Sequence, residues 1–496
     1  MGLLATLGVL TAGAQGPKTK AQAYVNRVAR QEPLKGSVWG VLAVNSKGDT
    51  LARYNAGSRM VPASNMKLVT TGAALHKLGG SFTYETGIGY SGKVEGGILK
   101  GDLYIIGGGD PTLAAPDSIA TPTFTLFSRW KNFLLRAGIK QIEGRVIGDG
   151  RYFNGANDHQ SWNWEDIGTE DGTGGSGLSY YKNRKEFGVA PGKTAGAPVI
   201  IREGAPETPW MRYEYRGVTA PAGTGDNIYL FTTDLAPVGE IRGTYALGRK
   251  LKTERFSNKF GALTCAYHFC QFLVRGGIPV TGGPADIDKD GRIRCGFESA
   301  PTERAASSDS LVRIGNTQSP TLARICRETN FRSDNFYAET LLRTLGKKET
   351  GTDNYDSSAT VERKVLESLG LRTEGGIVIN DGSGLSRKNN VSPAFFVQFL
   401  AAMRRSPAWK DYLASLPVPG SNGTMHFVLS GLTDDTKQRI HLKSGSMSGI
   451  LCYSGYILPK EGGKDTIYFS IMTGNGNVDA AKVRPVITQI IALLAE

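Results

Sequence analysis

The chain has 496 residues with 58 Lys and Arg against 45 Asp and Glu, so its formal net charge is +13 and its pI is near 9.4. This is about three domains' worth of chain, and its 40% hydrophobic residues exclude a wholly disordered protein. The 65 glycines follow no G-X-Y period, which excludes collagen-like structure. No run of five basic residues occurs, so we expect a solvated basic surface and no nucleic-acid partner.

The first residues are typical of a secretory signal peptide. Leu3 to Leu10 are apolar, and Ala12-Gly13-Ala14 is the kind of pattern after which a signal peptidase cuts. No Lys or Arg precedes the apolar part, which departs from the usual pattern. We expect residues 1–14 to direct export. No apolar stretch after residue 20 reaches the ~18 residues of a membrane span, so we expect no transmembrane anchor.

The elements predicted next along the chain alternate between helix and strand. Apolar spacing and turn residues predict a helix over 18–30, a hairpin over 37–44 and 50–54, and a helix over 65–78. From residue 84 the predicted secondary structure changes to short strands broken by glycines, over 84–106 and 141–148. A helix is predicted between them, over 124–137. Residues from about 150 to 300 are rich in Gly, Pro, Trp and Tyr, with strands over 198–202 and 227–232 and a helix over 261–274.

From residue 310 onward helices dominate, and strands return at the end. We predict helices over 311–328, 335–345, 359–368 and 393–404 and strands over 376–380, 440–443, 452–458 and 465–473, followed by a closing helix. The beginning and the end of the chain are therefore both predicted to mix helices and strands, as in an α/β domain. The β-rich middle is interpreted as an insertion.

The five cysteines indicate neither a disulfide framework nor a metal site. An odd, sparse count leaves room for one or two disulfides outside the cytoplasm. Cys265, His268 and Cys270 lie close together, but the stretch around them is apolar and no second ligand pair with zinc spacing follows. A buried helix is the favoured interpretation, and we expect no metal and no cofactor.

Three short motifs occur in a fixed order. Ser64-Asn65-Met66-Lys67 is S-x-x-K, Ser333-Asp334-Asn335 is S-x-N, and Lys443-Ser444-Gly445 is K-[ST]-G. Each alone is weak: Ser64 and Ser333 could simply cap helices, and Lys443 could be a solvated lysine. A second S-x-x-K, from Ser179 to Lys182, has no helical context and is interpreted as accidental.

The motif residues can be assigned chemical roles from their spacing. Residues three apart share a helix face, so Lys67 lies one turn from Ser64 and can take the proton of its hydroxyl. A neutral Lys67 requires a lowered pKa, for which the Lys443 ammonium is the candidate cause. Ser333 can then pass a proton toward the leaving group, while Asn335 holds the substrate amide.

The strand that carries the third motif is the expected substrate-binding edge. Lys443 to Ser446 can pair with an extended peptide, so Ser444, Gly445 and Ser446 are candidate substrate-binding residues. The backbone N–H groups of Ser64 and Ser446 would form the oxyanion hole.

With all three motifs in order, the sequence resembles the penicillin-recognising serine D,D-peptidases. The wide gap between the first two motifs favours the class C low-molecular-mass penicillin-binding proteins, the D-alanyl-D-alanine carboxypeptidase/endopeptidase family (peptidase family S13). The likeness covers nearly the whole chain after the signal segment. It rests on Pro62 to Lys67, Gly107 to Leu113, Trp162 to Asp166, Arg332 to Asn335, Asp381 to Arg387 and Gly423-Thr424.

The resemblance implies a fold, an activity and a compartment. The fold is an α/β (α+β) transpeptidase-like domain with an antiparallel sheet flanked by helices, built from residues 18–84 and 303–496, with two β-rich domains inserted over 85–302. The activity is hydrolysis of peptidoglycan stem peptides through an acyl-enzyme on Ser64, inhibited by β-lactam antibiotics. The location is the periplasm of the bacterial cell envelope.

Two features of this chain modify that expectation. The third motif has Ser444 where the family has Thr; the hydroxyl is kept, so we expect activity. The resemblance also implies that an acidic residue of the insert lies near the substrate side chain. We assign Asp158 to that role and add Asp334 to the substrate-binding set. The alternatives are a β-lactamase or esterase on the same fold, a non-catalytic peptidoglycan-binding scaffold, and a binder of anionic polymers.

Overall fold

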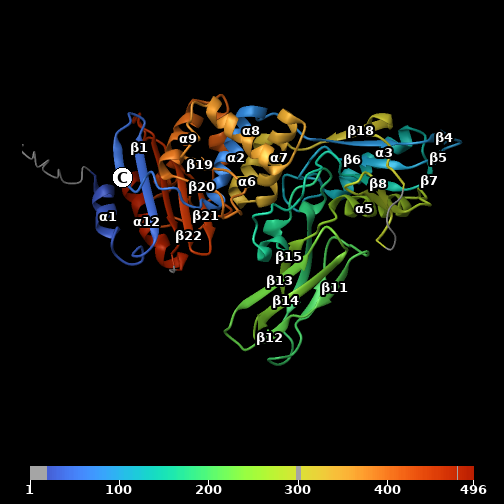
Figure 1. Ribbon diagram of the computed structural model, residues 1–496, viewed down its shortest axis with the longest axis horizontal. Coiled ribbons are helices and arrows are strands. Elements are labelled where there is room, and N and C mark those ends of the chain that lie inside the picture. Colours follow the sequence, from blue (N-terminus) through green and yellow to red (C-terminus); the bar gives the residue numbers. More distant parts are fainter. Residues whose placement is uncertain (1–18, 298–302, 477–478) are drawn as a thin grey trace, which may run out of the picture.

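The computed structural model describes residues 19–297, 303–476 and 479–496, so the predicted signal peptide lies outside the described residues. The two ends of the chain build one body, and the middle of the chain projects from it in two further parts (Figure 1). In the described part of the chain, no helix combines the length and apolarity needed to cross a bilayer.

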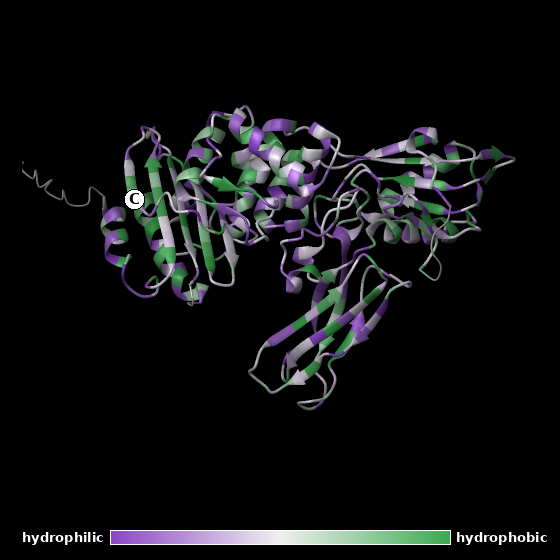
Figure 2. Cartoon of the chain, viewed as in Figure 1, coloured by the Kyte–Doolittle hydropathy of each residue, from purple (hydrophilic) through white to green (hydrophobic). Residues whose placement is uncertain are grey.

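The body is organised around one five-stranded antiparallel sheet that joins both chain ends. Its strands, in spatial order, are β2 (Thr50–Tyr54), β1 (Val38–Asn45), β23 (Ile467–Gly474), β22 (Ile450–Ile457) and β21 (Ile440–Met447). The inner strands are strongly apolar because helices cover both faces of the sheet (Figure 2). Strand β21 is an edge strand, so one side of it is left without a partner in the sheet.

Helices pack on the two faces of this sheet around separate apolar cores. One face carries α2 (Met66–Leu78), α6 (Leu322–Arg332), α7 (Asn335–Thr350), α8 (Tyr355–Ser368), α9 (Pro393–Arg405) and α10 (Trp409–Ser415). The other face carries α1 (Lys20–Val28) and α12 (Ala480–Ala495). The short α11 (Asp434–Arg439) leads into β21, and β19 (Ile377–Val378) pairs with β20 (Asn390–Val391).

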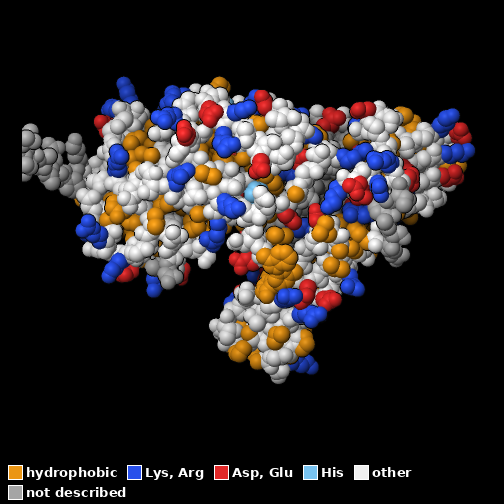
Figure 3. Space-filling view, in the orientation of Figure 1, with side chains coloured by type: hydrophobic (Ala, Val, Ile, Leu, Met, Phe, Trp, Pro, Cys, Tyr) orange, Lys and Arg blue, Asp and Glu red, His pale blue; other side chains and the backbone are white. Residues whose placement is uncertain are grey.

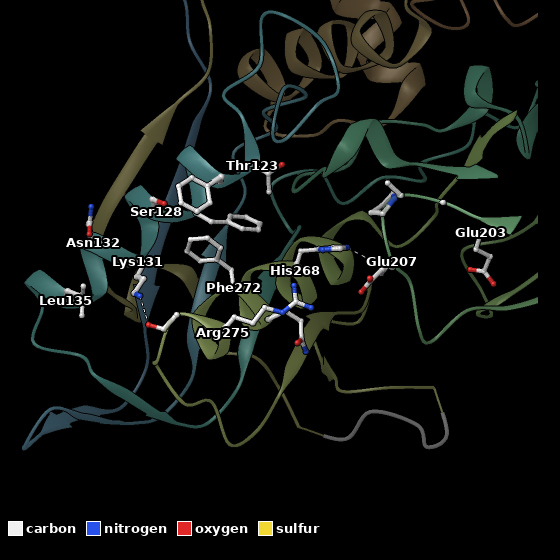
Figure 4. A pocket seen from close by; sticks show the side chains of 17 residues that line it. Thr123, Ser128, Lys131, Asn132, Leu135, Glu203, Glu207, His268, Phe272 and Arg275 are labelled. Atoms are coloured by element: carbon white, nitrogen blue, oxygen red, sulfur yellow. Dashed lines mark hydrogen bonds between the residues drawn. The ribbon is translucent and has the colours of Figure 1, made fainter. Parts of the chain in front are cut away.

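The first inserted part is a six-stranded sheet packed against two helices. Its strands, in spatial order, are β17 (Ile293–Arg294), β16 (Pro284–Ile287), β8 (Val146–Asp149), β6 (Leu103–Ile106), β3 (Glu85–Tyr90) and β18 (Val312–Gln318). A smaller sheet holds β4 (Lys93–Glu95), β5 (Ile98–Lys100) and β7 (Gln141–Glu143). The helices are α3 (Thr123–Arg136) and α5 (Gly261–Arg275), and an apolar groove runs between them (Figure 4).

The second inserted part is all β, with a small core of its own. One sheet holds β10 (Ile200–Glu203), β9 (Arg184–Ala190) and β15 (Lys252–Ser257). The other holds β11 (Arg212–Tyr215), β14 (Val238–Ala246), β12 (Val218–Ala220) and β13 (Asp226–Thr232). Between the two parts and the body lie the short helices α4 (Trp164–Ile167), η2 (Glu170–Gly172) and η3 (Tyr181–Asn183).

The helix predicted over 311–328 is wrong in its first half. Residues Val312–Gln318 form β18, which pairs with β3, and helix α6 begins only at Leu322. Gly315 and Pro320 both disfavour a continuous helix there, and the free edge of β3 supplies a partner for a strand. The division into domains stays a prediction. Strand β18 pairs with β3 in the sheet of the insert, so by sheet pairing the insert extends to Gln318, beyond the predicted boundary at residue 303.

The cysteine-containing stretch is the buried helix that its apolar pattern predicts. Cys265 and Cys270 lie in α5 and pack in the core of the first inserted part, where burial raises the pKa of Cys270 to about 11. Cys326 and Cys452 are also buried, and Cys295 is exposed; all five thiols are free. Within the described ranges, no three His, Cys, Asp or Glu side chains are grouped so as to hold a metal ion.

Candidate active site

The fold brings all three sequence motifs to one place between the sheet and the helical layer. Ser64 lies in the short helix η1 (Ala63–Asn65) directly before α2, so the S-x-x-K serine stands at a helix start as predicted. Ser333 is the left-handed residue between α6 and α7, and Lys443 lies on β21. Residues far apart in sequence are therefore joined by side-chain hydrogen bonds.

The Lys67 amine makes three hydrogen bonds at this place. Its Nζ donates to Ser64 Oγ at 3.0 Å, to Asn335 Oδ1 at 2.6 Å and to the Ser383 carbonyl at 2.8 Å. Its side chain is fully buried, and burial lowers its pKa to about 8, against the opposing charges of Asp171 and nearby carboxylates. Burial is the main cause of this shift, and the expected repulsion between the Lys67 and Lys443 ammonium groups is seen in the lowered pKa of Lys443.

The neutral form of Lys67 has the geometry of a base for Ser64. A neutral amine has two hydrogens and one lone pair, and the two fixed acceptors, Asn335 Oδ1 and Ser383 O, take the hydrogens. The lone pair then faces the Ser64 hydroxyl at 3.0 Å, within the range for proton transfer.

Lys443 supports the second serine of the site. Its Nζ donates to Ser333 Oγ at 2.9 Å and to the Ser444 carbonyl at 2.7 Å. Burial, together with the Lys67 charge, holds the pKa of Lys443 well below its usual value. Ser333 is thus bonded to an amine that can exchange a proton with it.

Gly445 allows β21 to lie directly against the turn that holds Ser64. A Cβ at residue 445 would come within 2.3 Å of the Pro62 carbonyl and 3.1 Å of the Ser64 nitrogen. Ala63, immediately before the nucleophile, has φ of 45°, a strained value for a residue with a side chain. Ser446, one residue further along β21, is exposed, so the open end of the edge strand faces solvent beside the nucleophile.

Sequence reasoning missed the loop that supplies the third partner of Lys67. Glu339 accepts from the backbone N–H groups of Ser383 at 2.8 Å and Gly382 at 3.2 Å, and so fixes the Ser383 carbonyl against Lys67. Burial, with the neighbouring Asp381 charge, raises the pKa of Glu339 to about 8. The signal for this loop in the sequence is the glycine-rich run from Asp381 to Ser386, whose contact with Lys67 cannot be predicted from local spacing.

Asp381 connects the same loop to the insert. It accepts from the backbone N–H groups of Gly384 at 2.9 Å and Ser386 at 2.6 Å, and from Asn389 Nδ2 at 2.6 Å. Trp162 of the insert donates its indole N–H to Asp381 Oδ2 at 2.9 Å, the oxygen that also accepts from Ser386 N. The insert therefore contacts the loop that orients Lys67.

Asp334 and the second S-x-x-K sequence belong together. Asp334 caps helix α7 by accepting from Tyr337 N, and it accepts from Lys182 Nζ at 2.8 Å; Lys182 also bonds Asp117 at 2.9 Å. Ser179 bonds to Ser176 instead. Lys182 thus holds the S-x-N turn in place. Ser179, the serine of the same S-x-x-K sequence, takes no part in the Ser64 site.

The predicted acidic residue of the insert is engaged elsewhere. Asp158 accepts from the buried Lys259 Nζ at 2.6 Å, and its role toward substrate stays a prediction. Asp171 is the insert carboxylate that acts on Lys67, and its backbone carbonyl accepts from Asn335 Nδ2 at 3.3 Å. Nothing in the sequence distinguishes Asp171 from its neighbours Glu165, Asp166 and Glu170.

Comparison with known proteins gives a consistent picture over the whole chain. The D-Ala-D-Ala carboxypeptidase 3 (S13) family matches residues 21–280 and 299–496. A D-alanyl-D-alanine carboxypeptidase of Actinomadura sp. (strain R39) is 28% identical over 483 residues, which cover 92% of this chain and 81% of that protein. Penicillin-sensitive carboxypeptidase A of Dictyostelium discoideum is 25% identical over 501 residues, covering 93% and 88%.

Solved structures share the fold. The crystal structure of penicillin binding protein 4 from Haemophilus influenzae superposes with a TM-score of 0.77 at 21% identity, covering 95% of this chain and 98% of that one. Its complex with a β-lactam gives a TM-score of 0.71. The predicted transpeptidase-like fold with inserted domains and the family resemblance are both confirmed. The chain belongs to the D-Ala-D-Ala carboxypeptidase 3 (S13) family and is an enzyme, a serine peptidase of the carboxypeptidase type.

Proposed function

We propose that this enzyme cleaves peptidoglycan stem peptides after D-Ala, both as a D-Ala-D-Ala carboxypeptidase and as a D,D-endopeptidase on cross-links. The observation that carries the proposal is the buried Lys67 amine, 3.0 Å from Ser64 Oγ, with two fixed acceptors that direct its lone pair. A serine hydroxyl needs such a base to attack an amide.

The reaction proceeds through an acyl-enzyme. Ser64 Oγ attacks the D-Ala carbonyl carbon as Lys67 takes its proton, and the backbone N–H groups of Ser64 and Ser446 stabilise the oxyanion. Ser333, bonded to Lys443, delivers a proton to the leaving nitrogen as the C–N bond breaks. The proton taken from Ser64 passes from Lys67 to Ser333, which returns both groups to their starting states. Water then attacks the ester and gives up a proton to the neutral Lys67. That proton returns to Ser64 Oγ as the ester bond breaks, and the released peptide carboxylic acid ionises in solution.

The same site accounts for the proposed inhibitors and partners. A β-lactam places a strained amide where the peptide carbonyl binds, so Ser64 opens its ring and is trapped as an ester. The substrate is a cell-wall polymer outside the cytoplasm, which fits the export predicted from residues 1–14. The enzyme is proposed to act in the periplasm, and Asp158 remains its proposed contact to the stem side chain.

Covalent labelling with a fluorescent penicillin tests the proposal. The wild type is expected to be labelled and Ser64→Ala is not, because the variant lacks the attacking oxygen. Ser179→Ala is the matched control, since it removes the serine of the second S-x-x-K sequence, and it is expected to label like the wild type. Labelling that persists in Ser64→Ala would exclude this nucleophile, and rapid penicillin turnover without a trapped ester would indicate a β-lactamase.

A further inference from the structure

A second cavity opens beside the catalytic residues, between the insert and helix α6. It has a volume of about 520 Å³ and is bordered by Ser333 and Asn335 on the catalytic side. This size is within the range of pockets that bind small molecules. Residues of the insert, among them Arg184 and Arg255, form the opposite wall. The lining also holds the carboxylates of Asp117, Glu170, Asp171, Glu328 and Asp334.

Three guanidinium groups line this cavity, and their internal ion pairs are loose. Arg332 Nε lies 3.3 Å from Glu328. Arg184 lies 3.3 Å from Glu170 and 3.5 Å from Glu186, and Arg255 lies 3.8 Å from each of these two carboxylates. Charge-assisted N–H···O bonds are usually ~2.7–2.9 Å. The side chains of Arg332 and Arg255 are also 58% and 47% exposed, so their donors are available to a ligand carboxylate.

Lys182 differs from these arginines because two carboxylates already pair with its ammonium group. Lys182 also lines the cavity, but its ammonium is held by Asp117 at 2.9 Å and by Asp334 at 2.8 Å, and it is nearly buried. Its charge is already compensated. The capacity to bind an anion therefore lies with the arginines.

The position of the cavity indicates which half of a substrate it receives. Ser333 Oγ is the group that delivers a proton to the leaving nitrogen in the proposed reaction, so that nitrogen must lie next to Ser333. The acyl half instead extends along the free edge of β21. A leaving group larger than D-Ala would continue from Ser333 into the cavity.

We propose that this cavity binds the leaving half of a cross-linked substrate, an acidic peptide whose free carboxylates bind Arg332, Arg255 and Arg184. The inference rests on the proposed function and names the subsite that favours endopeptidase cleavage. It predicts that the charge of the leaving peptide, and not only its length, determines the rate.

Three substrates with the same acyl half test this subsite. The first releases D-Ala, the second is a cross-linked dimer that releases a peptide with free carboxylates, and the third is that dimer with those carboxylates amidated. The readout is kcat/KM for the dimer divided by kcat/KM for D-Ala release. This ratio is expected to fall about tenfold or more in Arg332→Gln and in Arg255→Gln, because each variant removes a charged hydrogen bond.

The controls separate the subsite from the reaction itself. Arg275→Gln changes an exposed arginine of α5 at the distant groove (Figure 4), and it is expected to change neither rate. The ratio for the amidated dimer is expected to be the same in all proteins. An unchanged ratio with the charged dimer in both variants, or an equal fall with the amidated dimer, would overturn the subsite. A wild type that releases neither product and forms no penicillin ester would instead overturn the proposed function.

Discussion

At the scale of single residues, the decisive feature is the burial of the Lys67 side chain away from solvent. Lys67 is fully buried, and its removal from solvent lowers its pKa to about 8 even though several carboxylates oppose the shift. An ordinary solvent-exposed lysine is almost entirely protonated near neutral pH and cannot accept the serine proton. Burial therefore converts a common surface residue into a base.

The pH dependence of acylation is expected to follow Lys67. The neutral amine is the active form, so the rate of penicillin ester formation should rise about tenfold per pH unit below pH 8 and level off above it. Stopped-flow measurements from about pH 6 to about pH 10 would record this profile. Lys67→Ala is expected to lose acylation while remaining folded by circular dichroism. A rate that does not change between about pH 6 and about pH 8 would remove Lys67 from the role of base.

At the scale of elements, the site depends on the close approach of β21 to the helix start at Ser64. The two elements come together only because residue 445 has no side chain: a Cβ would lie 2.3 Å from the Pro62 carbonyl. That approach positions both the nucleophile and the strand edge offered to substrate. Packing of the elements, and not only the motif, thus sets the geometry of the proposed oxyanion hole.

Gly445→Ala tests this dependence. The added methyl must push β21 away from Pro62, so we expect the rate of penicillin acylation to fall by about 100-fold or more, as for a misplaced catalytic group. Gly57→Ala is the matched control because its Cβ meets no atom within 4 Å, and it is expected to react normally. Acylation in Gly445→Ala within a few-fold of the wild type would contradict this account.

At the scale of the whole molecule, the insert is joined to the catalytic body by buried polar contacts. Arg343 of α7 forms a fully buried ion pair with Asp353 and also donates to the carbonyls of Gly155 and Gly175 in the insert. Trp162 provides another connection, to the loop beside Lys67. The basic charge is scattered and interleaved with acidic side chains on the visible face, without one dominant basic patch there (Figure 3).

Breaking the buried pair is expected to loosen the whole assembly. Arg343→Met leaves the Asp353 charge buried without its partner and should lower the free energy of unfolding by about 3–5 kcal/mol. Urea denaturation followed by tryptophan fluorescence would measure it. Arg363→Met, at an exposed position on α8, is expected to change stability by less than about 0.5 kcal/mol. Adding Asp353→Asn to Arg343→Met should recover part of the loss; a single variant as stable as the wild type would contradict the role of this pair.

The sequence by itself determined the family, the order of the motifs and most of the elements. The proposed roles of Ser64 and Lys67 follow from local spacing, because three residues make nearly one helical turn and place both side chains on one face. The helix error over 311–328 shows the limit of local patterns, since β18 exists through its pairing with β3.

Only the tertiary structure decided what surrounds these residues. Burial is the main cause of the lowered pKa of Lys67, and the partners that orient its amine are Asn335 and Ser383, far away in the chain. Glu339 and Asp171 have no motif of their own. Their effects on Lys67 arise from desolvation and from contacts between elements. Such contacts depend on distance in space, so no periodic pattern in the sequence predicts them.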